Sequence, residues 1–132
     1  MAFGDGQELQ RFETAMEAVG LAWWWMELPS GVVFFSPNKA HMLGRDPGDF
    51  VHYKQFTELV HPDDVEPMMQ DMRDHLEGRK PLYETSYRIK HADGHYVRFL
   101  DRGKIVGQRG KETLLAGFVF DADQYDSVFN KP

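Results

Sequence analysis

Hydrophobic and polar positions alternate most clearly in the last third of the chain, where three apolar runs are separated by polar gaps that contain glycine. The runs cover residues 82–90, 96–106 and 113–120. The first gap contains Asp93-Gly94, a strong hairpin signal because glycine adopts a positive φ without steric cost. The pattern therefore predicts three sequential antiparallel strands.

A second hairpin is predicted near the start of the chain. Residues 21–28 are almost continuously apolar and include Trp23, Trp24 and Trp25. Neighbouring residues of a strand point to opposite faces, so Trp24 faces away from the other two. A turn at 29–31 and a strand at 32–35 follow, which brings the predicted sheet to five strands.

The residues between the two hairpins favour helices. Ser36-Pro37 places a capping hydroxyl before a proline at the first position of a short helix, which Leu43-Gly44 ends. One or two helical turns are expected in 50–60, and His61 is interpreted as the cap of a longer helix that closes at Gly78. That helix carries an apolar stripe, and we expect this stripe to pack on the sheet. The stripe consists of Val65, Met68, Met69, Met72 and Leu76.

Residues 7–19 predict an amphipathic helix ahead of the first strand, with Gly20 able to end it in the left-handed conformation. Its stripe consists of Leu9, Phe12, Met16 and Val19. Either this helix covers its own sheet, or it packs on a second copy of the protein. The expected organisation is a flanking helix at 1–20, an α+β domain at 21–122 with its helices on one face of the sheet, and the start of a linker at 123–132.

Composition narrows the range of functions. A chain of 132 residues is one ordinary domain, and its net charge of −6 argues against binding to a nucleic-acid backbone. The absence of cysteine excludes a disulfide, a thiolate nucleophile and a thiolate-ligated metal. There is neither a signal-peptide pattern nor an apolar run of about 18 residues, so we expect a cytoplasmic location without membrane contact.

Candidate catalytic and metal-binding residues are few. Asp63 and Asp64 are adjacent on a helix and point in different directions, and no common catalytic or phosphate-binding motif occurs. His91 and His95 flank the predicted hairpin tip and could lie side by side, but zinc sites need three or four fixed ligands. The sequence therefore predicts neither an enzyme nor a metal site.

Several short motifs, in order and spacing, resemble the PAS domain of bacterial sensory proteins with its C-terminal PAC segment. The resemblance covers about residues 20–123. Its carriers are Trp24-Trp25-Met26-Glu27, Ser30-Gly31, Ser36-Pro37, Leu43-Gly44, Val60-His61-Pro62-Asp63-Asp64, Tyr87-Arg88-Ile89, Asp93-Gly94-His95-Tyr96, Gly117 and Asp121. Family members often carry Trp at the position of Arg98, and their closing Asp-Ile-Thr is Asp121-Ala122-Asp123 here. The resemblance implies a five-stranded antiparallel sheet that cradles helices, with Asp121 coupling the sheet to an effector.

The resemblance also implies a ligand site between the sheet and the helices. The residues expected to bind a ligand there are Trp24, Met26, Met68, Met69, Met72, Tyr87, Ile89, Phe99, Leu115 and Val119, with Val97 facing the same way. Methionine is flexible, so such a wall can adapt to a guest or fill itself, and a plain packed core is the alternative.

The known cofactors of the family can be compared with the residues present. A light-oxygen-voltage flavin adduct and a thioester-linked chromophore both require cysteine, which is absent. Haem-binding members use a histidine on the long helix, but we expect His75 to leave the apolar stripe. No single residue excludes non-covalent FAD, yet neither haem nor FAD is expected, and the cofactor is left unassigned.

The predicted outer face of the sheet is unusually apolar for a soluble monomer. It would carry Trp23, Trp25, Arg98, Phe118 and Phe120, beside Phe12 and Met16 of the first helix. An isologous homodimer would cover it. We therefore expect a dimeric regulatory domain of a histidine kinase or diguanylate cyclase type of protein, which binds a small molecule or a partner and relays this to a C-terminal effector. The alternative is a ligand-free dimerisation module.

Overall fold

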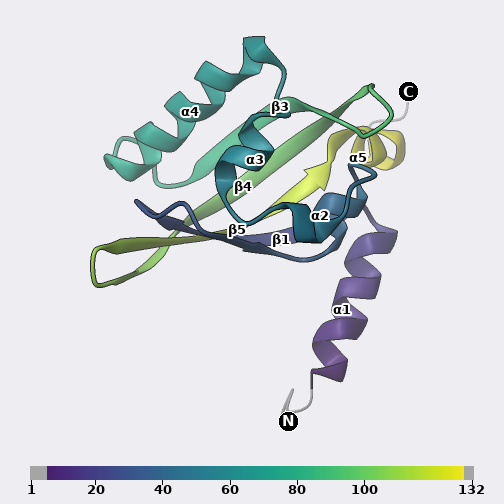
Figure 1. The fold of residues 1–132 in the computed structure, drawn as a ribbon, viewed down its shortest axis with the longest axis horizontal. Helices are drawn as coiled ribbons and strands as arrows, with labels where there is room; N and C mark the ends of the chain where they lie inside the picture. Colours follow the sequence, from purple (N-terminus) through teal and green to yellow (C-terminus); the bar gives the residue numbers. More distant parts are fainter. Residues whose placement is uncertain (1–5, 130–132) are drawn as a thin grey trace.

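The computed structural model describes residues 6–129 and contains one five-stranded antiparallel sheet (Figure 1). Its strands are β1 (Leu21–Leu28), β2 (Val33–Phe35), β3 (Tyr83–Lys90), β4 (Tyr96–Arg109) and β5 (Glu112–Asp121). They lie in the order β2-β1-β5-β4-β3, so the two predicted hairpins meet through the β1–β5 pair. The predicted α+β class is confirmed. The expectations for residues 1–5 and 130–132 lie outside the described residues.

The helices between β2 and β3 lie on one face of the sheet, as predicted (Figure 1). They are α2 (Asn38–His41), the 3-10 helix η1 (Pro47–Asp49), α3 (Tyr53–Thr57) and α4 (Pro62–Leu76). The helix α1 (Gln7–Ala18) extends away from the sheet and buries none of its residues, so it does not cover the outer face. The last helix, α5 (Ala122–Phe129), follows β5 directly.

The β4–β5 hairpin is longer than the hydrophobic pattern predicts. Its turn is reduced to Gly110-Lys111, with Gly110 at φ +60°, and the polar Gln108 and Arg109 still pair with β5. A β-bulge between Ile105 and Gly107 shifts the register. Both faces of this end of the hairpin meet solvent, so polar residues there do not mark the end of a strand.

The two predicted helix caps have different outcomes. His61 does cap α4, because its Nδ1 accepts the Asp63 N–H at 3.1 Å. Ser36 does not cap α2: its hydroxyl accepts the Trp23 N–H of β1 at 3.2 Å, while Pro37 occupies the cap position. The buried hydroxyl of Ser36 therefore ties the helical layer to the sheet.

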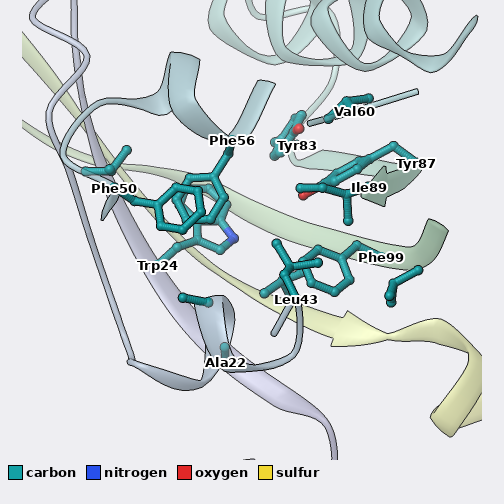
Figure 2. Close-up of a cluster of buried hydrophobic side chains, with 14 of the residues drawn as sticks. Ala22, Trp24, Leu43, Phe50, Phe56, Val60, Tyr83, Tyr87, Ile89 and Phe99 are labelled. Carbon is teal, nitrogen blue, oxygen red and sulfur yellow. The ribbon is translucent and has the colours of Figure 1, made fainter. Parts of the chain in front are cut away.

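The core fills the space between the sheet and the helices (Figure 2). Phe99, Ile89, Leu115 and Val119 are completely buried there, and Val97 is nearly so. On the helical side, the rings of Phe50 and Phe56 stack with their centroids 4.0 Å apart. The predicted inward direction of these strand residues is confirmed.

The two terminal helices meet at one end of the sheet. Gly20 ends α1 with φ +69°, as predicted. Asp121 Oδ1 accepts the N–H groups of Asp123 and Gln124 at the start of α5. The Gln124 side chain in turn donates to the Ala18 carbonyl of α1 at 3.1 Å. Residues expected to begin a linker thus form a capped helix that contacts α1.

Candidate functional site

The candidate site is built on Trp24, whose indole lies across two glycines of neighbouring strands. Trp24 pairs with Gly117 of β5, which pairs with Gly103 of β4. A Cβ atom would approach the Trp24 ring to 2.5 Å at Gly117 and to 2.6 Å at Gly103. Only glycine at both positions leaves room for the ring, which also contacts Tyr83 edge-on.

Asp101 is the polar centre of this arrangement. It is buried, and it accepts hydrogen bonds from Trp24 Nε1 at 2.5 Å and from the Tyr87 hydroxyl at 2.9 Å. Burial raises the pKa of Asp101, whereas the positive charge of Lys39 and the two hydrogen bonds act in the opposite direction. Figure 2 shows Trp24, Tyr83 and Tyr87 directed into the space between the sheet and α3.

A pocket of about 240 Å³ lies between this part of the sheet and helices α3 and α4. Of the predicted ligand-binding residues, Trp24, Met26, Met68, Met69, Met72 and Tyr87 line it. Ile89, Phe99, Leu115 and Val119 do not: they are packed in the adjoining core with no exposed surface. The predicted set therefore contains both a pocket wall and a packed core, because alternation gives the face of a residue but not its place along the strand.

Two buried charged residues of the pocket are absent from the predicted set, as is the more exposed Arg73 of α4. Lys39 of α2 and Asp101 of β4 both line the pocket and are buried. Asp101 follows Val97 and Phe99 at the alternate, inward-facing positions of β4. A carboxylate at such a position could have indicated a polar group inside the domain. Lys39 gave no comparable signal, since a four-residue helix is too short for a hydrophobic period.

His75 is buried, contrary to the expectation that it leaves the apolar face of α4. Its Nε2 accepts the Ile105 N–H of β4 at 2.9 Å, and its Nδ1 lies 3.0 Å from the Lys80 carbonyl. Both ring nitrogens are thus used by backbone groups, which fixes the end of α4 near the bulge in β4. This geometry does not suit an axial haem ligand.

His91 and His95 lie side by side at the β3–β4 turn, with ring centroids 4.7 Å apart. With Asp93 they form a group whose possible ligand atoms lie within 4.8 Å of one another. His91 Nδ1 already accepts the Asp93 N–H, and Asp93 and His95 are exposed. These contacts stabilise the turn between β3 and β4.

The residues predicted for dimerisation and relay fall into two groups. Trp23, Trp25 and Phe118 lie on the outer face of the sheet beside the exposed Phe34, which α1 leaves uncovered. Arg98 instead binds Asp126 of α5, and Asp121 caps α5, so both belong to the junction between the sheet and the C-terminal helix. On α1, Phe12 is exposed and Met16 is half-buried.

A five-stranded antiparallel sheet with a pocket beneath helices on one face defines the class to which this chain belongs. The family model of the PAS fold matches residues 32–119, more than half of the chain. The chain therefore belongs to the PAS family.

Solved structures agree with this assignment. The chain is similar to the N-terminal domain of a diguanylate cyclase with a PAS/PAC sensor from Marinobacter aquaeolei, at 26% identity and a TM-score of 0.68 over 77% of this chain and 94% of that one. A sensory box histidine kinase/response regulator from Burkholderia thailandensis has the same fold at 20% identity and a TM-score of 0.67, over 89% of this chain and 90% of the other. No curated protein matches the sequence. No helix within residues 6–129 is long and apolar enough to cross a membrane.

Proposed function

We propose that this chain is a cytoplasmic sensory domain of a signalling protein, in which a small molecule occupies the pocket beneath α3 and α4. The observation that supports this most directly is the 240 Å³ pocket, because Trp24, Met72 and Tyr87 form its wall as the family resemblance predicts. Met68 and Met72 give the helical wall the flexibility to adapt to a guest. The domain itself would regulate an effector rather than catalyse a reaction.

The route of the relay is proposed to run from the pocket through the sheet to α5. Asp101 at the pocket wall pairs with Val119 of β5, and β5 ends two residues later at Asp121, the cap of α5. Arg98, on the opposite face of β4, holds Asp126 of the same helix. A shift of the sheet on ligand binding would therefore reach α5 through its first residues and through this ion pair.

The pocket is tested by Met72→Trp, which places a large ring where the ligand is expected. Native mass spectrometry of the purified protein, compared with denatured protein, first identifies any bound small molecule. We expect Met72→Trp to lower the affinity for that molecule at least tenfold. Overpacking is expected to cost about 1–3 kcal/mol of unfolding free energy, so thermal denaturation must show that the variant is folded.

Val51→Trp is the matched control, because Val51 is exposed and lies outside the pocket. It adds the same side chain and should leave the affinity unchanged. Equal affinity of Met72→Trp and the unmodified chain would contradict the placement of the ligand.

A ligand-free dimerisation module is the second candidate function. It is supported by the exposed stripe of α1, where Leu9 and Phe12 are more than half exposed, and by the exposed Phe34 and Phe118 on the outer face of the sheet. A second copy of the chain would cover both surfaces in an isologous dimer. Dimerisation is also compatible with the sensory proposal, in which the same interface would pair two effectors.

A further inference from the structure

Lys39 is the most unusual charged residue of the pocket. Its side chain is buried, with an exposed fraction of 8%, and it reaches the pocket from α2. Its Nζ lies 4.0 Å from the centroid of the Phe56 ring. Among residues 6–129, no hydrogen bond or ion pair joins Nζ to a protein acceptor.

A buried ammonium normally has an acceptor, because removing its hydration is costly. The Phe56 ring offsets part of this cost through a cation–π interaction but accepts no conventional hydrogen bond. Burial lowers the pKa of Lys39, and the charge of Asp101 opposes this effect. The N–H donors of Lys39 therefore line the pocket without a protein acceptor and are open to an anionic or strongly polar group there.

Asp101 does not meet this need, although it lines the same pocket. One of its oxygens accepts from Trp24 and the other from Tyr87, and no ion pair joins it to Lys39 in the described chain. This carboxylate is thus held by two donors of the sheet. This leaves the Lys39 side of the pocket for a group carried by the guest.

We propose that the pocket selects a small apolar monocarboxylate whose carboxylate accepts hydrogen bonds from Lys39. This inference deepens the proposed sensory function and rests on it. Apart from Thr57, Arg73 and Asp101, the remaining wall is apolar or aromatic, with Met26, Tyr53, Phe56 and Met72 among its residues. A volume of about 240 Å³ lies just below the range of about 300–1,000 Å³ typical of ligand pockets, which suits one ring or a short aliphatic chain.

The test compares octanoate with 1-octanol, which has the same chain length but no charge. Binding to the 132-residue protein is followed by tryptophan fluorescence, since Trp24 forms part of the pocket wall. We expect octanoate to bind at least tenfold more tightly than octanol. Lys39→Met retains an apolar side chain of similar length and should abolish this preference while octanol still binds.

Lys54→Met is the matched control, because Lys54 is an exposed lysine on the neighbouring helix α3. It should keep the full preference for octanoate. Lys39→Met should lose little resistance to urea, because the buried charge that it removes has no protein acceptor, while Asp101 keeps its hydrogen bonds to Trp24 and Tyr87. A large loss of stability would indicate a structural role for the ammonium and contradict the inference.

Two further outcomes would overturn the inference while leaving the proposed sensory pocket intact. One is equal binding of octanoate and octanol, which would mean that the pocket does not select a charge. The other is an octanoate preference that persists in Lys39→Met, which would place the recognising cation elsewhere, for example at Arg73 on the pocket wall. If neither probe binds, the inference also fails, and native mass spectrometry then decides separately whether any guest occupies the pocket.

Discussion

At the scale of single residues, Asp64 and Arg88 join the first turn of α4 to β3. The Asp64 carboxylate accepts from the Arg88 backbone N–H at 2.8 Å and from its guanidinium Nε at 2.9 Å, while the other oxygen accepts from a terminal nitrogen at 2.8 Å. These hydrogen bonds to Arg88 lower the pKa of Asp64 to about 2. The pair therefore fixes the start of the helix that forms the outer wall of the pocket.

Asp64→Asn should lower the unfolding free energy by about 1 kcal/mol at pH 7, a value reduced from the full pKa shift because Arg88 is partly exposed. Because the folded pKa lies below the ordinary 3.8, the stabilisation is complete above about pH 4 and is lost as the pH falls towards 2. Urea denaturation should show that the difference in unfolding free energy between Asp64→Asn and the unmodified chain falls by roughly half at pH 3.

Asp63→Asn is the control, because Asp63 carries the same charge in the same helical turn without contacting Arg88. It reports the helix dipole together with the weaker interactions of Asp63 with His61 and with the charge of Arg88. A pH-independent difference between Asp64→Asn and the unmodified chain would contradict the ion pair as its cause.

At the scale of elements, the glycine pair in β4 and β5 determines how the sheet forms the pocket. The Trp24 ring can lie flat on the sheet and reach Asp101 only because Gly103 and Gly117 lack side chains. A Cβ atom at Gly117 would also lie 2.2 Å from the Arg102 carbonyl oxygen, which is backbone and cannot move aside cheaply. The sheet therefore tolerates no side chain at this point.

Gly117→Ala should accordingly lower the unfolding free energy by about 2 kcal/mol or more, since overpacking forces a backbone shift. Gly107→Ala is the matched control in the same hairpin, where a Cβ atom would meet only Leu114 at 3.7 Å, an ordinary contact. Its effect should stay below about 1 kcal/mol. Urea denaturation measures the unfolding free energy of both variants. Similar losses in the two would show that the close packing around Gly117 is not the cause of the destabilisation.

The sequence predicts elements better than it predicts this site. The stripe from Val65 to Leu76 and the alternation in the strands gave the helix, the five strands and the inward face, because repeated burial leaves a period. The roles of Lys39 and Gly103 leave no such period in the sequence. They depend on contacts with Phe56 and Trp24, which are far away along the chain. The sequence likewise does not determine the direction of α1, because its apolar stripe could pack equally well on its own sheet or on a second copy of the protein.

At the scale of the whole molecule, the two faces of the sheet differ. The helices α2, α3 and α4 cover the inner face (Figure 1). None of them covers the outer face, where Trp23, Trp25 and Phe118 lie. The exposed stripe of α1 adds to this apolar surface. A surface of this kind usually marks an interaction site in a soluble protein.

We predict that the chain sediments as a dimer at tens of micromolar, and that Phe12→Asp combined with Trp25→Asp converts it to a folded monomer. The charges would be buried without partners in the dimer but solvated in the monomer. Val51→Asp, at an exposed position that lines neither hollow beside Trp23, Trp25 and Phe118, should leave the dimer intact. Sedimentation of the unmodified chain as a monomer would contradict the prediction.

The contact between α1 and α5 has a thermodynamic consequence. Gln124 of α5 bonds to Ala18 and packs so closely on Gly20 that a Cβ atom there would lie 2.3 Å from its side-chain oxygen. If a guest in the pocket changes the free energy of this contact, the contact must change the affinity of the guest by the same factor, because the two equilibria are linked. A partner or neighbouring domain that binds α1 and α5 would then change the ligand concentration at which the domain responds. The same pocket could therefore serve signalling proteins that respond to very different concentrations of one ligand.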